Sequence, residues 1–402
     1  MSIFAACEMG PVDPILGTAT AFRSDSHPKK VNLGVGAYRD ENGKPLVFKI
    51  VKKIEQALAN DPTQDKEYAP IEGLAGVLKE PCLKLLFGPL DAEMRNRVAS
   101  VQTLSGTGAL RVGAEFISLH LKPPAVYVSS PTWETHRSIF KKAGIEVQEY
   151  PYWSPETKAI DFANLIACLN SAPTGSVILL HGCAHNPTGM DPSEAQWVEI
   201  VRVIQKQKLI AFVDNAYQGY ASGDLEKDAL LQRLLLSTGC EFFVSQSFAK
   251  NLGMYGERIG MLHVVCDGQD TADRVLSQLK LVIRPMYSSP PIHGAKLVVG
   301  VLGDAGNFKE WSQELKAVAG RIHRMRAKLR AGLEERTGKE WQHITEQIGM
   351  FSFTGLSVAQ CERLIDKWHI YLLKNGRISM AGLNEANLDY VVEAFDEVTR
   401  AV

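Results

Sequence analysis

The chain lacks the features that place a protein in a membrane or on nucleic acid. Its 44 basic and 45 acidic side chains give a formal net charge of −1, so no charge excess favours nucleic acid or an anionic lipid surface. No apolar run approaches the roughly 20 residues of a membrane-spanning helix, and the longest lies between Lys296 and Asp304. We expect no nucleic-acid partner and no membrane partner.

Cysteine is scarce, and a basic leader segment is missing. The seven cysteines are scattered and form no CxxC pair, which is typical of free thiols in a reducing compartment. No basic residue precedes Arg23, whereas Glu8 and Asp13 are acidic, and this composition fits neither a secretory nor a mitochondrial targeting peptide. The expected location is cytoplasmic.

What is present predicts an α/β fold with two domains. Between about 98 and 265, strand-like apolar runs alternate with helical patterns, as in a mostly parallel sheet. Over 305–337, hydrophobic residues recur every three or four positions, which predicts one long helix bridging to a smaller α+β domain. We predict an N-terminal arm (1–13), a large domain (46–310) and a small domain built from both chain ends (14–45 and 311–402).

Small and polar residues follow four of the predicted strands. They are Ser105-Gly106-Thr107-Gly108, His185-Asn186, Asp214 to Tyr217, and Ser247 to Lys250. Active sites of parallel α/β sheets lie at the carboxyl ends of the strands, so we expect these four segments to converge on one crevice.

Lys250 is the first candidate for chemistry. It follows a strand pattern at 241–246 and is flanked by Phe248, Leu252 and Met254. Desolvation favours the neutral amine, which is the form that attacks a carbonyl group. A lone lysine after a strand is more often a solvated surface residue, so the case for Lys250 depends on the rest of the chain.

Two of the segments that precede Lys250 could bind charged groups, one an anion and the other a cation. Ser105, Gly106 and Thr107 open a helix, where N–H groups and hydroxyls can bind an anion, although an ordinary capped turn is equally compatible. A buried Asp214 needs a cation or strong donor, such as a protonated pyridine ring whose oxygen could accept from the Tyr217 hydroxyl. The alternative for Asp214 is a helix N-cap.

Three other patterns in the sequence each have more than one interpretation. His181, Cys183 and His185 would share a strand face, but no fourth ligand is near, so we expect no metal. Ser247-x-x-Lys250 matches the SxxK motif of serine acylases, without that motif's companion triads. Arg284 and Arg377, in loop-like settings, could clamp carboxylates or form surface ion pairs.

Taken together, the motifs resemble those of the pyridoxal-phosphate-dependent aspartate aminotransferases, from about Asn32 to the C-terminus. The matching segments, in order, are SGTGAL, PTWETH, HNPTG, VDNAYQGYASG, SFAKN with the later ER pair, RPMYSSPP, GMFSFTGL and NGRISMAGL. The resemblance implies a fold-type I transferase with a mostly parallel, seven-stranded-type sheet between helices. It also implies the cofactor pyridoxal 5'-phosphate and a homodimer with shared active sites.

The resemblance assigns roles to residues in this chain. Lys250 becomes the Schiff-base lysine and proton shuttle, Asp214 the partner of the pyridinium nitrogen, and Tyr217 and Asn186 the donors to the ring oxygen. Trp133 stacks on the ring. The phosphate is held by Ser105, Gly106, Thr107, Ser247 and Arg258, with Tyr68 reaching in from the other subunit.

The same resemblance gives the substrate contacts. Arg377 binds the α-carboxylate beside Trp133 and Asn186, and Arg284 of the neighbouring subunit binds the distal carboxylate, while Gly36 and Phe351 close over the substrate. Two arginine clamps select a dicarboxylate. The predicted reaction is L-aspartate plus 2-oxoglutarate to oxaloacetate plus L-glutamate, in two half-reactions through a pyridoxamine phosphate form.

Two positions depart from the pattern. Many aspartate-specific members carry asparagine where this chain has Ser289, and asparagine is also common where it has Gly256. An aromatic or broad-specificity aminotransferase therefore stays open. A non-catalytic relative is opposed by the presence of Lys250, Asp214 and both arginines.

Overall fold

A computed structural model describes residues 2–10 and 14–400. Its centre is a seven-stranded sheet in the order β2-β10-β9-β8-β7-β3-β4. The strands are β2 (Val98–Leu104), β3 (Val126–Ser130), β4 (Val147–Pro151), β7 (Val177–His181), β8 (Ile210–Asn215), β9 (Phe242–Ser247) and β10 (Ile259–Val265). Only β10 runs antiparallel to its neighbours, so the predicted mostly parallel sheet is confirmed.

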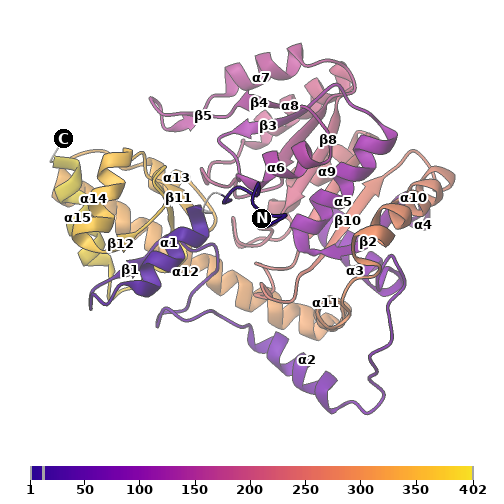
Figure 1. The fold of residues 1–402 in the computed structure, drawn as a ribbon, viewed down its shortest axis with the longest axis horizontal. Helices are drawn as coiled ribbons and strands as arrows, with labels where there is room; N and C mark the ends of the chain where they lie inside the picture. Colours follow the sequence, from indigo (N-terminus) through magenta and orange to yellow (C-terminus); the bar gives the residue numbers. More distant parts are fainter. Residues whose placement is uncertain (1, 11–13, 401–402) are drawn as a thin grey trace.

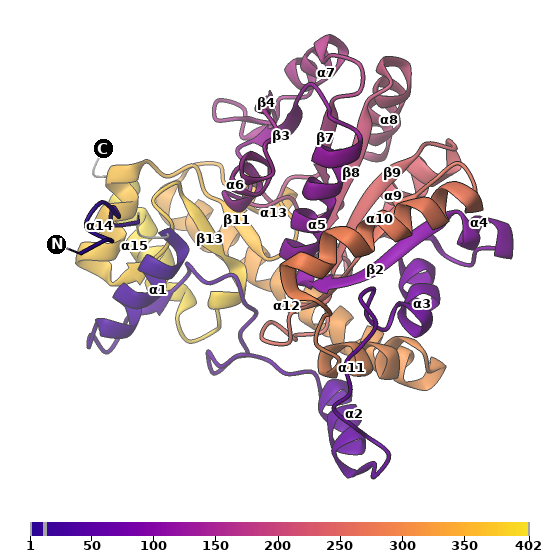
Figure 2. The ribbon, with the colours of Figure 1, turned by 45° about the vertical axis from the view of Figure 1, so that its right-hand side comes forward.

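Helices cover both faces of this sheet because the central strands are apolar on both sides. On one face, α5 (Ser105–His120), α6 (Thr135–Lys142) and α10 (Gln269–Tyr287) pack against strand residues such as Phe212 and Leu262. On the other, α3 (Ala75–Phe87), α7 (Phe162–Ser171), α8 (Glu194–Gln207) and α9 (Leu230–Ser237) pack against the alternate residues, such as Val213 and Val244. Figures 1 and 2 show the sheet between these layers.

A second group of elements lies to one side of the sheet (Figure 1). It contains α1 (Pro14–Ser24), α13 (His343–Glu346), α14 (Val358–Trp368), α15 (Leu388–Arg400) and the short strand pairs β1 (Val31–Asn32) with β12 (Ile370–Tyr371) and β11 (Phe351–Phe353) with β13 (Arg377–Ser379). The parallel β1–β12 pair joins the two ends of the chain. Below the sheet, α2 (Lys49–Asn60) contacts α11 (His293–Leu302).

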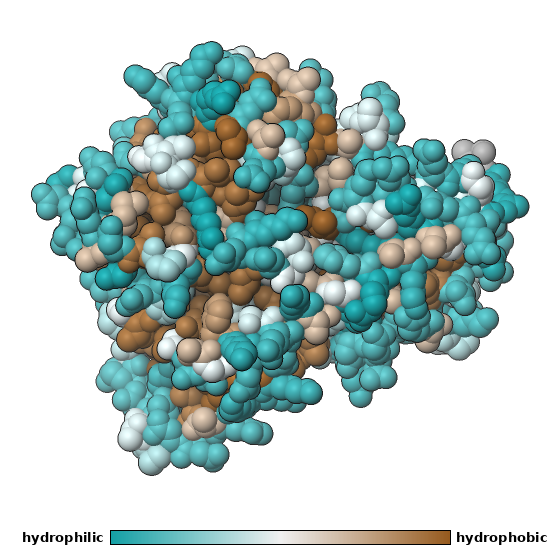
Figure 3. Space-filling model, turned by 180° about the vertical axis from the view of Figure 1, so that it is seen from behind, coloured by the Kyte–Doolittle hydropathy of each residue, from teal (hydrophilic) through white to brown (hydrophobic). Residues whose placement is uncertain are grey.

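The 33-residue helix α12 (Ala305–Thr337) links the two groups, and its predicted bounds are confirmed. It runs from the neighbourhood of α11 to α13 and α15, burying Trp311, Leu315, Ile322 and Leu329 (Figure 1). Hydrophobic side chains gather on the rear face of the sheet-bearing part, while the part around α14 and α15 is more hydrophilic there (Figure 3). Within the described residues, no helix has the length and apolarity needed to cross a membrane.

The two arginines expected in loop-like settings lie in regular secondary structure, so both local predictions were wrong. Arg377 begins β13. Arg284 is not in a loop: α10 continues through Pro285 to Tyr287, because Leu279, Val282 and Ile283 pack against the sheet. Of the arm predicted at 1–13, residues 1 and 11–13 lie outside the described residues, and residues 2–10 contain no helix or strand.

Candidate functional site

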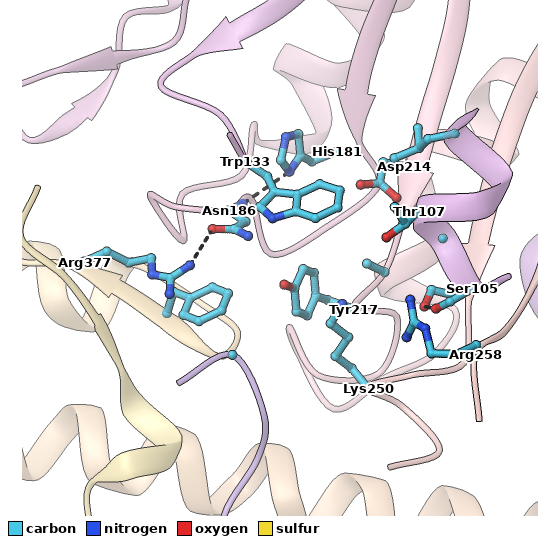
Figure 4. A pocket seen from close by; sticks show the side chains of 16 residues that line it. Ser105, Thr107, Trp133, His181, Asn186, Asp214, Tyr217, Lys250, Arg258 and Arg377 are labelled. Carbon is cyan, nitrogen blue, oxygen red and sulfur yellow. Dashed lines mark hydrogen bonds between the residues drawn. The ribbon is translucent and has the colours of Figure 1, made fainter. Parts of the chain in front are cut away.

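One cavity lies at the carboxyl ends of β2, β7, β8 and β9, where the four polar segments were predicted to converge. The residues lining it are Gly36, Ser105, Gly106, Thr107, Leu110, Trp133, His181, Asn186, Asp214, Ala216, Tyr217, Ser247, Lys250, Arg258, Phe351 and Arg377. All the predicted site residues of this chain are among them except Tyr68 and Arg284. Figure 4 shows the side chains pointing into the cavity from both groups of elements.

One end of the cavity has anion-binding geometry. The hydroxyls of Ser105 and Ser247 lie 2.9 Å apart at the first turn of α5, beside Thr107 and the guanidinium of Arg258. Gly106 leaves room here, because an added Cβ would lie 3.1 Å from the Cβ of Ser247, a tight contact. Hydroxyls, a helix N-terminus and an arginine together fit a phosphate group.

Asp214 lies at the other side, where β8 ends. Its Oδ2 is 3.0 Å from Nε2 of His136, whose Nδ1 is 2.8 Å from Thr132 Oγ1. Burial raises the pKa of Asp214, but the hydrogen bond with His136 and the neighbouring basic side chains, His136 foremost, outweigh it, so the net shift is downward. Asp214 is therefore held ionised, which fits a cationic ring nitrogen.

His136 is the residue that the sequence analysis missed. It belongs to the PTWETH motif, three positions after Trp133 in the first turn of α6, and it is fully buried. A histidine one turn beyond a lining tryptophan was the available clue. Its partner could not be inferred, because Asp214 is far away along the chain.

The histidines near by are engaged in hydrogen bonds. His181 contacts Thr132 at 3.2 Å and accepts from the N–H of Asn186, and burial lowers the pKa of His181 to about 3. His185 lies 2.8 Å from both Ser129 Oγ and Thr188 Oγ1. Because β7 ends at His181, the expected shared strand face for His181, Cys183 and His185 was wrong. No group of three His, Cys, Asp or Glu suited to a metal occurs within the described residues.

The Lys250 amine has the environment that the sequence predicted. Burial and the nearby Arg258 cation lower the pKa of Lys250, and Asp214 opposes them only in part. Its Nζ lies 5.3 Å from the ring centroid of Tyr217, and no hydrogen bond joins it to any described residue. An aldehyde-bearing ligand fits such an amine.

The serine-acylase alternative finds no support in this geometry. Ser247 Oγ lies 2.9 Å from Ser105 Oγ and accepts from the N–H of Ala249. Lys250, which would have to be its general base, makes no hydrogen bond with it. Ser247 therefore has no activating base among the described residues.

Arg377 enters from β13 and is only 2 % exposed. Its Nη1 donates to Asn186 Oδ1 at 3.3 Å and its Nη2 to the Gly34 carbonyl at 3.1 Å, and the guanidinium lies 4.1 Å from the ring centroid of Phe351 (Figure 4). Burial lowers the pKa of Arg377 to about 10, so it remains a cation at neutral pH. Its buried Nε has no partner, and no carboxylate of the described residues pairs with it, which fits a carboxylate-bearing ligand.

Tyr68 and Arg284 lie away from this cavity. Tyr68 is 85 % exposed. Arg284, near the C-terminus of α10, donates to Ser288 at 2.5 Å. The structure of one chain therefore does not bring these two predicted residues to the others. Ser289 and Gly256, which depart from the expected pattern, do not line the cavity either.

Comparison with known proteins identifies the class. Residues 28–395 match the family model described as aminotransferase class I and II, and the chain belongs to this family. It is 50 % identical to a cytoplasmic aspartate aminotransferase of Oryza sativa subsp. japonica, over 98 % of this chain and 97 % of the rice protein.

Two solved structures are similar over nearly the whole chain. An aspartate aminotransferase from Saccharomyces cerevisiae cytoplasm superposes with a TM-score of 0.96 at 43 % identity, covering 99 % of each chain. An aromatic-amino-acid aminotransferase from Burkholderia pseudomallei, covalently bound to pyridoxal phosphate, superposes with a TM-score of 0.95 at 42 % identity, covering 99 % of this chain and all of the other. The family is pyridoxal-phosphate-dependent.

Proposed function

We propose that this chain is an aspartate aminotransferase that moves the amino group of L-aspartate to 2-oxoglutarate. The observation that carries the proposal is the arrangement of three side chains in one cavity: the desolvated Lys250 amine, the ionised Asp214 and the buried Arg377, which pairs with no carboxylate of the described residues. The similarity to aspartate aminotransferases over almost the full chain supports it.

The residues present fit pyridoxal 5'-phosphate. This cofactor supplies an aldehyde for an amine and an electron-withdrawing ring that acidifies the α-hydrogen of an amino acid. Ser105, Gly106, Thr107, Ser247 and Arg258 would hold its phosphate, and Asp214 its ring nitrogen. Tyr217 and Asn186 would donate to its ring oxygen, and Trp133 would cover the ring.

The chain's own groups then supply binding and proton transfer. Arg377 binds the substrate α-carboxylate through its guanidinium and fixes the α-hydrogen near Lys250. The neutral Nζ of Lys250 accepts the α-proton and returns it as an ammonium group to the carbon that becomes the amine carbon. Gly36 and Phe351 exclude water on the substrate side, which strengthens the carboxylate–arginine pair.

Lysine in place of Arg377 tests the carboxylate clamp. Arg377→Lys keeps the charge but loses the two-pronged donor geometry and the packing on Phe351, so we expect KM for L-aspartate and for 2-oxoglutarate to rise about 100-fold. Steady-state kinetics with each substrate varied measures this change. Arg274→Lys on the exposed side of α10 is the matched control and should leave both values unchanged. An Arg377→Lys enzyme with unchanged KM values would remove Arg377 from the substrate site.

We propose two domains and a homodimer. The domains are the large domain at 46–310 and the small domain at 14–45 and 311–402, preceded by the arm at 1–13. Tyr68 and Arg284 of one subunit would serve the cavity of the other, because both lie outside the cavity of their own chain. The hydrophobic area on the sheet-bearing part offers apolar surface for such an interface (Figure 3).

Hybrid dimers test the shared site. Lys250→Ala and Arg284→Asp chains should each form almost inactive homodimers. Co-expressed with different affinity tags and purified as hybrids, they should regain activity, because one of the two cavities then has Lys250 from one chain and Arg284 from the other. Hybrids of Lys250→Ala with Arg377→Asp are the control and should stay inactive, since both residues belong to the same chain's cavity. An inactive Lys250–Arg284 hybrid would contradict the proposed sharing.

A panel of amino donors tests the proposed substrate. With 2-oxoglutarate as acceptor, L-aspartate should give the highest kcat/KM, ahead of L-tyrosine and L-phenylalanine. The aromatic alternative is favoured by the similarity to the Burkholderia enzyme. Higher kcat/KM for the aromatic donors would establish that alternative instead.

We propose a cytoplasmic location, supported by the similarity to the cytoplasmic rice protein. Chloroplastic and mitochondrial aspartate aminotransferases are also similar to the chain, at 50 % and 48 % identity. Imaging of a C-terminal fluorescent fusion in the native cell distinguishes a cytoplasmic protein from a chloroplastic or mitochondrial one.

A further inference from the structure

Arg326, outside the cavity, is a buried cation without a counter-charge. It lies on the inner side of α12 and is 2 % exposed. Within the described residues it forms no ion pair, and its Nε has no hydrogen-bond partner. Burial lowers the pKa of Arg326 to about 9, so it still carries its charge at neutral pH.

Three backbone carbonyls surround its guanidinium. Nη1 donates to the Ile344 carbonyl at 2.9 Å, and Nη2 donates to the carbonyls of Gly349, at 2.9 Å, and Phe351. Neutral carbonyls compensate a buried charge only in part, and an apolar side chain of similar volume would often be at least as stable. A contribution to folding stability therefore does not by itself explain an arginine at position 326. A need to fix the backbone of the segment 344–351 does explain it.

The segment that Arg326 binds packs against the loop 184–189, which contains Asn186. Ile348 N donates to the Gly189 carbonyl at 2.7 Å. Gly349 has φ +80°, and a Cβ there would lie 2.4 Å from the Cβ of Ala184. A Cβ on Gly189 would likewise lie 2.7 Å from the Phe351 carbonyl. The two backbones approach so closely that a displacement of 348–351 must also move the 184–189 loop.

Two of the three supports of Arg377 belong to these two segments, and the third is the Gly34 carbonyl. The Phe351 ring centroid is 4.1 Å from the Arg377 guanidinium, and Asn186 Oδ1 accepts from its Nη1 at 3.3 Å (Figure 4). The Phe351 ring also lies close to Gly36: a Cβ added at Gly36 would be 3.9 Å from the ring's Cζ. Arg326 is thus connected to Arg377 through the backbone of Gly349 and Phe351, from a helix that links the sheet to the C-terminal elements.

We propose that Arg326 is a positioning residue for Arg377, the side chain that binds the substrate carboxylate. Arg326 holds the backbone carbonyls of Ile344, Gly349 and Phe351. It thereby fixes the positions of Phe351 and Asn186, and these two residues set the geometry with which Arg377 binds a carboxylate. The proposal rests on the proposed function, since the substrate's carboxylate is its readout. It assigns Arg326 no contact with substrate or cofactor.

Two variants of the full-length holoenzyme test the proposal. Arg326→Met removes the charge and all three hydrogen bonds while keeping volume, and Arg326→Lys keeps the charge but cannot reach three carbonyls in the arginine's planar geometry. We expect KM for L-aspartate and for 2-oxoglutarate to rise about tenfold in Arg326→Met, with a smaller change in kcat. Arg326→Lys should give an intermediate rise, and it keeps the test available if the methionine variant does not fold.

Binding of succinate gives a second readout that does not depend on turnover. Its Kd, from isothermal titration calorimetry of the cofactor-loaded protein, should rise in parallel with KM, while the cofactor absorption spectrum stays that of the wild type. Leu333→Ala is the matched control, because Leu333 is buried on α12 and none of its atoms makes those hydrogen bonds. It should lower Tm and leave KM and the succinate Kd unchanged.

Arg326 variants that lower Tm as Leu333→Ala does, with unchanged KM and succinate Kd, would overturn the proposal and make Arg326 purely structural. Failure of the proposed function looks different, because a wild-type protein without a cofactor spectrum or a response to L-aspartate would disprove it before any variant is compared.

Discussion

Replacing Lys250 with alanine is expected to lower turnover by at least about 10⁴-fold, the largest effect of any single change in the chain. Among the described residues, Lys250 is the only lysine that lines the cavity, and it is proposed both to bind the cofactor's aldehyde and to carry the α-proton. Removing the amine removes both functions at once. Turnover of L-aspartate with 2-oxoglutarate, measured with saturating pyridoxal phosphate, gives the result directly.

Two further variants separate the amine's chemistry from its charge. Lys250→Arg keeps a cation that cannot lose its proton near neutral pH, so it should be nearly as inactive as the alanine variant. Lys79→Met is the matched control: burial lowers the pKa of Lys79 as well, yet it lies on α3 outside the cavity, and the variant should keep full activity. A Lys250→Ala enzyme with more than about 1 % of wild-type turnover would contradict the assignment.

The second-largest effect is expected for Asp214. Asp214→Asn removes the negative charge proposed to pair with the ring nitrogen, and loss of one member of a buried ion pair costs about 3–5 kcal/mol. We therefore expect turnover to fall about 10²- to 10⁴-fold, with the cofactor still bound through Lys250 and the phosphate-binding residues. Asp214→Asn with turnover within about tenfold of the wild type would contradict this role.

His136 gives the same prediction a pH dependence. The hydrogen bond with His136 lowers the pKa of Asp214, and burial without it would raise that pKa. The active carboxylate form exists above its pKa, so activity that requires it is lost as the pH falls through that value. In His136→Phe the acid limb of the kcat/KM profile should therefore move to higher pH. His263→Phe, another buried histidine, lies outside the cavity and should leave the profile in place.

The sheet and its site were accessible from the sequence because their determinants are local. Six strands of the central sheet and the long helix 305–337 carry continuous or periodic apolar patterns that depend little on the rest of the fold. Parallel strands bring their carboxyl ends to one edge, so the sequence alone predicts that Lys250, Asp214, Asn186 and Ser105 lie together.

The remaining features depend on tertiary contacts. Arg326 falls at the spacing of the buried residues Ile322 and Leu329 of its helix, but only packing shows that its charge is surrounded by the carbonyls of the segment 344–351. His136 acquires its role from Asp214 across the sheet. The last turn of α10 forms despite Pro285 because its inner residues are held by the core. The edge strand β4 was not predicted, because its two polar residues interrupt the apolar pattern expected of a buried strand.

The absorption spectrum of the cofactor-loaded protein tests the central claim most directly. It is recorded before and after addition of L-aspartate, with no keto acid present and with Lys250→Ala beside it. We expect the wild type to show a pH-sensitive visible band, absent from the variant, that L-aspartate converts into the pyridoxamine phosphate spectrum with release of oxaloacetate. A protein that stays colourless after incubation with pyridoxal phosphate, or whose band L-aspartate leaves unchanged, would contradict the account.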